Sequence, residues 1–263
     1  MDRSFLMLAP IAALCVAQHA NAQVTILGSQ RSTYAAVGGS DFYTDDGDTI
    51  STNVPFSSFP SVCGTSQSGA AGCADATQYS QMSADAILAQ GSCGASTTTD
   101  APDLEQSFSN SVLVVRFRVD ADVRYRLFGS VSSNYAGSSV VLFRAGGSTV
   151  HHYYESISTA DFDELGTLPP GEYELHAVAD ASVNPSSPMS SIGANYQAEL
   201  RFGIPCPADF NADGAVDFFD YDEFVVCFEG TACPPGVSAD FDADGTIDFF
   251  DYDAFVVAFE TPC

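Results

Sequence analysis

Residues 208–230 read ADFNADGAVDFFDYDEFVVCFEG, and residues 239–261 read ADFDADGTIDFFDYDAFVVAFET. The two segments align without gaps at a spacing of 31 residues, and they are identical at 17 of 23 positions. A repeat of this length and identity indicates a duplicated structural unit. We therefore expect the C-terminal part of the chain to contain two copies of one small folded element.

Each copy begins with oxygen-bearing side chains at alternate positions, a pattern typical of a calcium-binding loop. Calcium takes six to eight oxygen ligands at roughly 2.3–2.6 Å, and a sharp turn at loop position 6 calls for glycine. Gly214 and Gly245 stand at that position, and Val216 and Ile247 at position 8 are expected to bring the paired loops into contact. The expected ligands at positions 1, 3, 5, 7, 9 and 12, with a backbone carbonyl at position 7, are Asp209, Asn211, Asp213, Ala215, Asp217 and Asp220 in the first loop and Asp240, Asp242, Asp244, Thr246, Asp248 and Asp251 in the second. The pattern predicts two calcium ions; magnesium, or a loop without metal, is the alternative.

Each loop is followed by aromatic and apolar residues at roughly helical spacing, which predicts one helix after each loop. No helix is expected before either loop, because Cys206-Pro207 and Pro234-Pro235-Gly236 precede them. Position 12 also holds aspartate in both copies, whereas the EF-hand pattern ends in glutamate. The unit is therefore a loop followed by a single helix, twice. The residues at helical spacing are Phe219, Phe224, Val225 and Phe228, then Phe250, Phe255, Val256 and Phe259.

The tail, residues 206–263, resembles the type I dockerin domain, whose duplicated loop has the pattern D-x-N-x-D-G-x-x-(N/D)-x-x-D. It is more similar still to the cysteine-bracketed dockerin-like tails at the C-termini of some secreted bacterial proteins. The resemblance implies that the residues named above hold calcium and that the domain docks onto a cohesin-like receptor or another surface anchor protein.

The tail departs from cellulosomal dockerins at loop positions 10 and 11. Those dockerins place small or hydroxylated residues there, whereas this chain has Phe218-Phe219 and Phe249-Phe250, and its tail contains no lysine or arginine. These departures favour an anchor other than a cellulosomal cohesin. We expect Phe219 and Phe250 to fill the small core between the helices, and Phe218 and Phe249 to be exposed and to contact the partner.

Four cysteines lie in the tail, and a domain of fewer than about 60 residues needs such cross-links to hold a small core. We expect one disulfide between Cys227 and Cys233, closing the link between the repeats, and a second between Cys206 and Cys263, joining the two ends. The other pairings stay open. Upstream, Cys63, Cys73 and Cys93 form an odd set, so one of them is free, pairs between chains or pairs with the tail.

The N-terminus has the pattern of an export signal. Arg3 is followed by an apolar run from Phe5 to Ala17, and Ala20-Asn21-Ala22 supplies the small residues at which signal peptidase cleaves. We expect residues 1–22 to be removed and the protein to be secreted, either extracellular or associated with the cell surface. A lipoprotein signal at Cys15 would require cleavage after Leu14, which is bulky for that position. No later apolar run approaches the roughly 20 residues that span a bilayer.

The charge of the chain is strongly negative. It has 34 acidic residues against 8 basic ones, all arginine, giving a net charge of −26. Nucleic acid and anionic membranes are bound through cationic contacts, so neither is an expected partner. From Cys206 onward there are 14 acidic residues and no basic ones, as expected of a segment that binds cations.

Residues 23–205 are predicted to form an antiparallel β-sandwich or jelly roll, which makes the protein mainly β with a small α-helical dockerin-like domain at residues 206–263. Alternating β-branched and aromatic residues predict strands, separated by Gly, Ser, Asn and Pro. Ala84 to Gln90 has the composition of a short helix. The expected strands are Val112–Val119, Val123–Val131, Ser139–Arg144, Gly171–Val178 and Ala194–Phe202.

The first two of these strands suggest a hairpin around residues 120–122. In that register Phe117 lies beside Tyr125 on the buried face, and four arginines gather on the outer face. Directly opposed like charges destabilise a sheet, so acidic groups are expected nearby. Glu172 and Glu174, on the outer side of their own strand, are the candidates, with the acidic tail or an anionic ligand as alternatives.

The upstream domain contains no recognised catalytic motif: G-x-S-x-G, H-E-x-x-H and a Gly-rich phosphate loop are all missing from the sequence. His151 and His152 are adjacent, so a strand would point them to opposite faces. The first hypothesis is therefore a non-catalytic binding or structural β-sandwich carried by a calcium-dependent docking tail. The second is a polysaccharide-degrading hydrolase, or a carbohydrate-binding component, that carries the same tail.

Overall fold

The computed structural model describes residues 24–67, 69–98, 104–184, 191–204, 206–212, 215–233 and 237–260. The signal peptide expected at residues 1–22 lies outside these ranges, as do Asp213, Gly214 and Cys263. Across the described ranges the chain forms mainly strands and two helices, which confirms the mainly β prediction. Neither helix is long and apolar enough to cross a bilayer.

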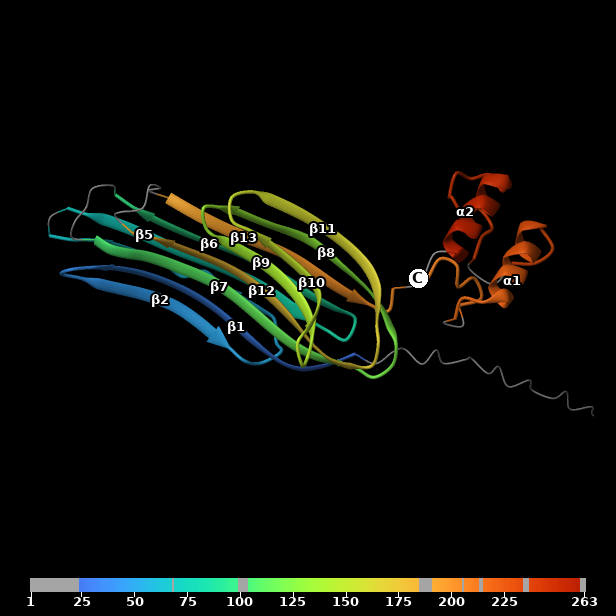
Figure 1. Ribbon diagram of the computed structural model, residues 1–263, viewed down its shortest axis with the longest axis horizontal. Helices are drawn as coiled ribbons and strands as arrows, with labels where there is room; N and C mark the ends of the chain where they lie inside the picture. Colours follow the sequence, from blue (N-terminus) through green and yellow to red (C-terminus); the bar gives the residue numbers. More distant parts are fainter. Residues whose placement is uncertain are drawn as a thin grey trace, which may run out of the picture.

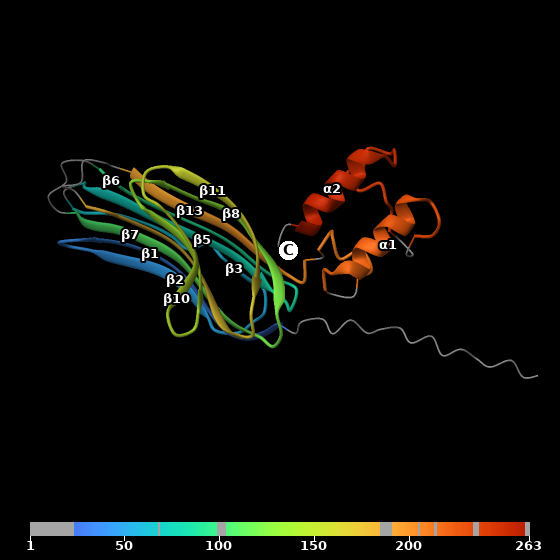
Figure 2. The ribbon, with the colours of Figure 1, turned by 45° about the vertical axis from the view of Figure 1, so that its right-hand side comes forward.

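The strands form two antiparallel sheets that face each other (Figures 1 and 2). Sheet A has the order β10-β9-β12-β7-β1-β2, and sheet B has the order β11-β8-β13-β6-β5-β3, with β4 also paired to β5. The bounds are β1 Val24–Gly39, β2 Tyr43–Ile50, β3 Phe56–Ser58, β4 Ser61–Thr65, β5 Ala71–Met82, β6 Ala86–Thr97, β7 Leu104–Val119, β8 Val123–Asn134, β9 Gly137–Arg144, β10 Ser148–Glu155, β11 Thr159–Leu168, β12 Gly171–Val183 and β13 Ser191–Phe202.

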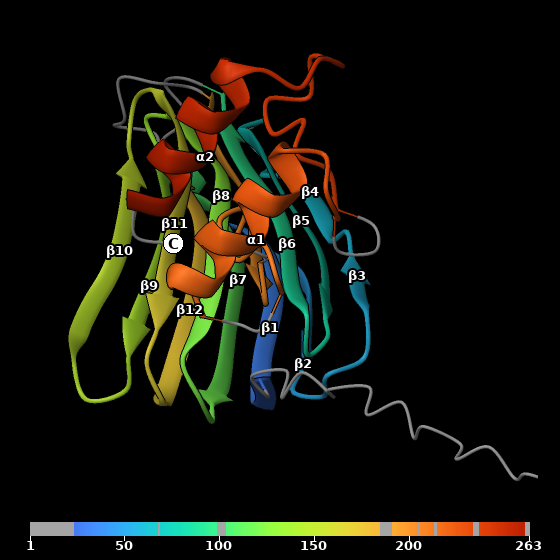
Figure 3. The ribbon, with the colours of Figure 1, turned by 90° about the vertical axis from the view of Figure 1, so that its right-hand side faces the viewer.

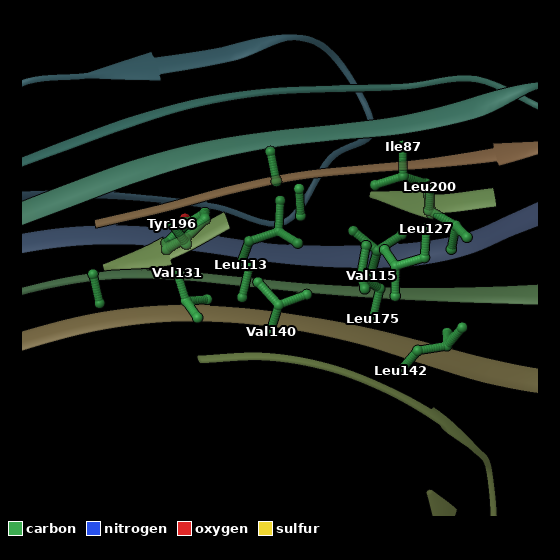
Figure 4. Close-up of a cluster of buried hydrophobic side chains, with 14 of the residues drawn as sticks. Ile87, Leu113, Val115, Leu127, Val131, Val140, Leu142, Leu175, Tyr196 and Leu200 are labelled. Carbon is green, nitrogen blue, oxygen red and sulfur yellow. The ribbon is translucent and has the colours of Figure 1, made fainter. Parts of the chain in front are cut away.

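One large hydrophobic core fills most of the space between the sheets, and a smaller cluster is formed by Ala35, Val37, Ala70 and Ala74. Alternate residues of a strand point to opposite faces, and the inward set of β7 and β8 is fully buried together with that of β12 and β13. Figure 4 shows Leu113, Val115 and Leu175 of sheet A meeting Leu127 and Leu200 of sheet B. All five predicted strands lie within observed ones, because their apolar alternation matches this one-sided burial.

The predicted hairpin is wrong. β7 pairs with β1 and β12 in sheet A, while β8 pairs with β11 and β13 in sheet B. The turn at residues 120–122 therefore carries the chain from one sheet to the other, and Phe117 and Tyr125 belong to opposite walls of the core. The predicted short helix at Ala84–Gln90 is also wrong, since Ala86 begins strand β6, where alternate residues are buried.

The arginines are consequently separated onto two outer faces, and Arg116, Arg118 and Arg126 each form an ion pair with an acidic neighbour. On sheet A, Arg116 lies opposite Glu174 and donates to its carboxylate at 2.5 Å, as the sequence predicted. On sheet B, Arg126 pairs with Asp163 of β11 at 2.6 Å.

One arginine lies inside the sandwich. The Arg31 side chain on β1 is fully buried. Its guanidinium donates to the carbonyl oxygen of Val54 at 2.7 Å, to that of Thr52, and to Ser80 Oγ at 3.3 Å. It also lies over the ring of Phe56, 5.5 Å from the centroid. These carbonyl contacts hold the segment after β2 against the sheet.

The upstream cysteines divide into a pair and a single thiol. Cys63 and Cys73 form a disulfide between β4 and β5. Cys93 is free and buried in the core. The odd member of the set is thus a core residue rather than a link to the tail.

The two helices follow the two loops and lie beyond one end of the sandwich (Figures 1 and 3). Helix α1 spans Phe218–Phe228 and helix α2 spans Phe249–Glu260. Phe224 and Phe255 are fully buried between them and stack with 4.0 Å between ring centroids. Phe210 and Phe241, at loop position 2, pack edge-on against this pair. A separate small core therefore joins the repeats; the expected division at residues 205 and 206 stays a prediction.

Candidate metal centre

The second loop brings three of its predicted ligands together. Carboxylate oxygens of Asp240, Asp242 and Asp244 lie within 4.8 Å of one another. Two oxygens bound to the same calcium ion, each at 2.3–2.6 Å from it, can be no more than about 5 Å apart. The spacing of the three carboxylates therefore fits one calcium ion at their centre.

The Asp240 side chain is arranged for a further partner. Its Oδ2 accepts a hydrogen bond from the Gly245 N–H at 3.1 Å, whereas Oδ1 is shielded from solvent and has no hydrogen-bond partner among the described residues. A buried carboxylate oxygen without a partner is costly. A cation bound between Asp240, Asp242 and Asp244 would satisfy it, so the residues present fit a calcium ion.

The charges in this loop are crowded. The hydrogen bond from the Asp244 N–H lowers the pKa of Asp242, but burial and the nearby carboxylates of Asp244, Asp251 and Asp240 raise it overall. Like charges held this close repel one another. A divalent cation at their centre would relieve that repulsion.

Position 12 closes each loop through backbone hydrogen bonds, and both its residues are fully buried. Asp251 accepts from the N–H groups of Asp242 and Asp248, at 3.1 and 2.8 Å. Asp220 accepts from Asn211 and Asp217 at 3.1 and 2.9 Å, the same positions one repeat earlier. Hydrogen bonds from the N–H groups of Asp248, Asp242 and Phe241 lower the pKa of Asp251 despite its burial. A carboxylate oxygen has more than one acceptor site, so these bonds leave room for a metal.

Position 9 caps the helix that follows. The Asp217 carboxylate accepts from the Phe219 N–H, and Asp248 accepts from the Phe250 N–H, both at 2.8 Å. Asp217 and Asp220 also form a reciprocal capping box at the start of α1. The helix start is thereby fixed to the loop, which explains why loop and helix recur as one unit.

Position 4 carries backbone strain that the sequence did not reveal. Ala212 and Ala243 have φ angles of 57° and 60°, in the left-handed region that disfavours residues with a Cβ. Gly245, at position 6, has a φ of 89°. The glycine expected at the turn is confirmed there, whereas the alanine positions carried no signal because alanine is not a turn residue.

The residues that fill the core of the helix pair are not all those that were predicted. Phe219 and Phe250 do not fill the core: they are 68% and 70% exposed, beside Phe218 and Phe249 at 78% and 79%. Phe219 precedes Phe224 by five residues, which is about 140° around a helix, so both cannot face inward. Val216 and Ile247 are 37% and 50% exposed, and the buried core between the repeats consists largely of aromatic residues. The contact expected between the loops at position 8 stays a prediction.

The disulfide between Cys227 and Cys233 is present, as predicted. Cys206 is also disulfide-bonded. Its predicted partner, Cys263, lies outside the described residues. The link between the repeats is therefore covalently closed directly after α1.

The histidines of the sandwich do not form a shared site. On β10, the Nε2 atom of His151 lies 2.6 Å from the Tyr125 hydroxyl, while His152 faces away. His176 on β12 lies 2.9 Å from Glu174. The adjacent histidines thus point to opposite faces, as the strand pattern predicted.

Comparison with known proteins adds nothing to the geometry of the site. No protein-family model and no curated protein matches the chain. The chain is similar over 65% of its length to 19% of the enzymatically active domain of bacteriophage CBA120 tailspike protein 4, at 11% identity and a TM-score of 0.25. For the secreted serine protease VesC of Vibrio cholerae the identity is 11%, the coverage 68% of this chain and 47% of that one, and the TM-score 0.19. For the infectious bursal disease virus VP2 subviral particle the identity is 9%, the coverage 78% of this chain and 88% of that one, and the TM-score 0.18.

Proposed function

We propose that the tail, residues 206–263, is a calcium-binding docking module of the dockerin type that attaches a non-catalytic β-sandwich to a partner outside the cell. The observation that carries this proposal is the second loop, where three carboxylates converge within 4.8 Å and one of their oxygens is buried without a partner. When bound, calcium supplies the positive charge that holds these carboxylates together.

The first loop supports a second ion through its equivalent hydrogen bonds. Asp220 and Asp217 make the same contacts as Asp251 and Asp248 one repeat later. The predicted ligand Asp213 lies outside the described residues, so the first site rests on its sequence identity with the second. Two ions per chain are the expected stoichiometry.

The docking surface we propose consists of Phe218, Phe219, Phe249 and Phe250. All four rings are exposed at the starts of the two helices. They form two equivalent patches rather than one, because Phe218 lies beside Phe259 near the end of α2, with 6.5 Å between ring centroids, so the two helix starts lie at opposite ends of the pair. Exposed aromatic rings of this kind mark interaction surfaces in soluble proteins. The surrounding tail has acidic residues and no basic ones, which favours an anchor protein with apolar pockets and a basic rim over a cellulosomal cohesin.

Calcium titration tests the metal site. Isothermal titration of the chain lacking residues 1–22 is expected to show two calcium ions, and Asp209→Asn with Asp240→Asn is expected to abolish binding. Asp222→Asn with Asp253→Asn is the matched control, because it removes the same charge from exposed, repeat-equivalent helix positions. No binding by the parent chain, or equal losses in both double variants, contradicts the calcium site.

Docking is tested separately. The labelled chain is incubated with cells of the producing organism, with calcium or with chelator, and Phe218→Ala with Phe249→Ala is compared with the parent. We expect retention that requires both calcium and the two rings. Calcium binding without any retention would leave the metal site standing and contradict docking.

A polysaccharide-degrading activity is the alternative function. An acid–base pair of carboxyl groups roughly 5–10 Å apart across a cleft would favour it. The open hollow over β8 and β11 contains Asp161 and Asp163, but Arg126 lowers the pKa of Asp163 through a hydrogen bond and its charge. A general acid needs a raised pKa. The lowered pKa of Asp163 therefore favours a surface ion pair over a catalytic acid at this place.

A further inference from the structure

The outer face of sheet A carries a groove of about 740 Å³ that crosses β1, β7 and β12. A bulge in β1 between Ile26 and Gly28 shifts its register against β7. Gly28 then lies opposite Arg116, which lies opposite Glu174 on the next strand. A Cβ atom at Gly28 would meet no other atom within 4 Å. The missing side chain at this outward position leaves that part of the groove open.

One wall of the groove is a fixed row of polar side chains. Arg116 Nε lies 2.5 Å from Glu174 Oε1, and His176 Nε2 lies 2.9 Å from Glu174 Oε2. The His176 ring is held from its other side by Phe143, with 4.7 Å between centroids. Burial raises the pKa of Glu174, but the hydrogen bonds from His176 and Arg116 lower it overall. The carboxylate is thus ionised at neutral pH and already neutralised by the guanidinium.

The rest of the groove is uncharged. Its opposite side presents hydroxyl and amide groups of Gln30, Thr49 and Ser51, and Val114 contributes an apolar floor. The charges of Arg116 and Glu174 cancel. A charged ligand would have to separate this ion pair, whereas an uncharged ligand rich in hydroxyl groups could hydrogen-bond to every group without disturbing it.

An aromatic hollow continues the groove along the same strands. Tyr34, Tyr43 and Phe108 line a second depression of about 420 Å³ on the outer face of sheet A. Tyr34 and Tyr43 are joined by a hydrogen bond of 2.6 Å between their hydroxyls. Gln30 and Tyr34 both point outward from β1 and are four residues apart, about 13 Å along a strand. The two hollows are therefore spaced to contact one extended ligand.

We propose that the outer face of sheet A binds an uncharged glycan chain. Sugar hydroxyl groups complement the paired carboxylate, guanidinium and amide groups of the groove, and the apolar faces of sugar rings complement the exposed tyrosine rings. The net charge of −26 and the acidic edge strand β2, with Asp45, Asp46 and Asp48, repel polyanionic chains. This site is separate from the calcium loops, so its ligand binding does not depend on calcium.

Affinity measurements with defined probes test the proposal. The chain lacking residues 1–22 is titrated, in the presence of chelator, with linear hexasaccharides of glucose, mannose, xylose and galactose, and with polygalacturonate as the anionic probe. We expect at least one neutral hexasaccharide to bind and polygalacturonate not to bind. If none of the four binds at about 5 mM, a concentration that detects millimolar affinities, or if polygalacturonate binds more tightly, the proposal is overturned.

Matched variants place the ligand on sheet A. Gly28→Leu places a side chain in the groove at a position where a Cβ atom meets nothing within 4 Å, and Tyr34→Ala removes part of the aromatic hollow. Each is expected to weaken binding about tenfold or more, as loss of a central contact does. Arg126→Ala and Tyr79→Ala make comparable changes on the outer face of sheet B and are expected to leave affinity unchanged. Binding that survives Gly28→Leu, or that falls equally in the sheet B variants, refutes the assignment. Because chelator is present throughout, failure of this site and failure of the calcium site are distinguishable.

Discussion

The rings of Phe224 and Phe255 lie parallel, with 4.0 Å between their centroids and 2° between their planes. The two residues are 31 positions apart and occupy equivalent places in the two repeats. The hydroxyls of Tyr221 and Tyr252, also equivalent, meet at 2.5 Å. The repeats therefore join through contacts between identical residues, as the two halves of an isologous interface do.

This stacking should dominate the stability of the tail. Phe224→Ala or Phe255→Ala removes a fully buried ring and is expected to cost about 3–5 kcal/mol. Phe218→Ala, at an exposed position of the same helix, is expected to cost less than about 0.5 kcal/mol. Urea unfolding followed by circular dichroism at 222 nm checks this, since the described helices are both in the tail. Equal effects of the two changes would show that the ring pair does not hold the tail together.

Calcium should stabilise the tail selectively. A ligand at 100 times its dissociation constant raises the free energy of unfolding by about 2.7 kcal/mol when it binds only the folded state. We expect chelator to lower the melting temperature of the helical signal while leaving that of the β signal unchanged. A common shift of both transitions would mean that calcium acts on the sandwich as well.

The left-handed backbone of Ala243 predicts that replacing this alanine with glycine stabilises the tail. Alanine in this conformation costs roughly 1–2 kcal/mol, so Ala243→Gly should stabilise the tail by about 1 kcal/mol. In α2, Ala254→Gly should instead destabilise it by about 0.5–1 kcal/mol, because glycine is more flexible when unfolded. Calorimetry of the two variants provides the comparison. Destabilisation by both would indicate that the loop strain at residue 243 is absent in solution.

The Cys93 thiol should be unreactive in the folded protein. Burial raises its pKa to about 12, so hardly any thiolate forms at pH 8, and the side chain is shielded from solvent. Ellman's reagent is expected to react with this thiol only after denaturation, and Cys93→Ser should abolish that signal. Rapid reaction of the native chain would contradict burial of residue 93.

The buried Arg31 should be sensitive to loss of its hydrogen bonds. Arg31→Met keeps much of the volume but leaves the carbonyl oxygens of Val54 and Thr52 without their donor. Hydrogen bonds to a charged group contribute about 1.5–3 kcal/mol each, so a loss of several kcal/mol is expected in the β transition. Arg126→Met, which removes an exposed ion pair, should cost no more than about 1 kcal/mol. Similar small losses for both would mean that Arg31 is replaceable.

The local sequence pattern was sufficient to predict an element where burial on one face makes apolar residues recur at a fixed period. Alternation predicted the strands around Phe117, Tyr125 and Leu175, and repeated loop spacings predicted which carboxylates gather in the second loop. The outward row of Arg116 and Glu174 also followed from alternation, because their strands lie side by side. Each of these predictions depends only on residues near in sequence or on a fixed strand geometry.

The sequence by itself therefore determined five of the strands, the loop ligands that converge and the disulfide between Cys227 and Cys233. Only the tertiary structure decided that β7 and β8 belong to different sheets, that Phe219 lies outside the helix core, and that Gly28 opens a groove. The physical reason is that period-two alternation fixes which face a side chain takes, but not which strand lies beside it. Partner strands and facing helices are chosen by packing across long stretches of chain, where residues distant in sequence meet.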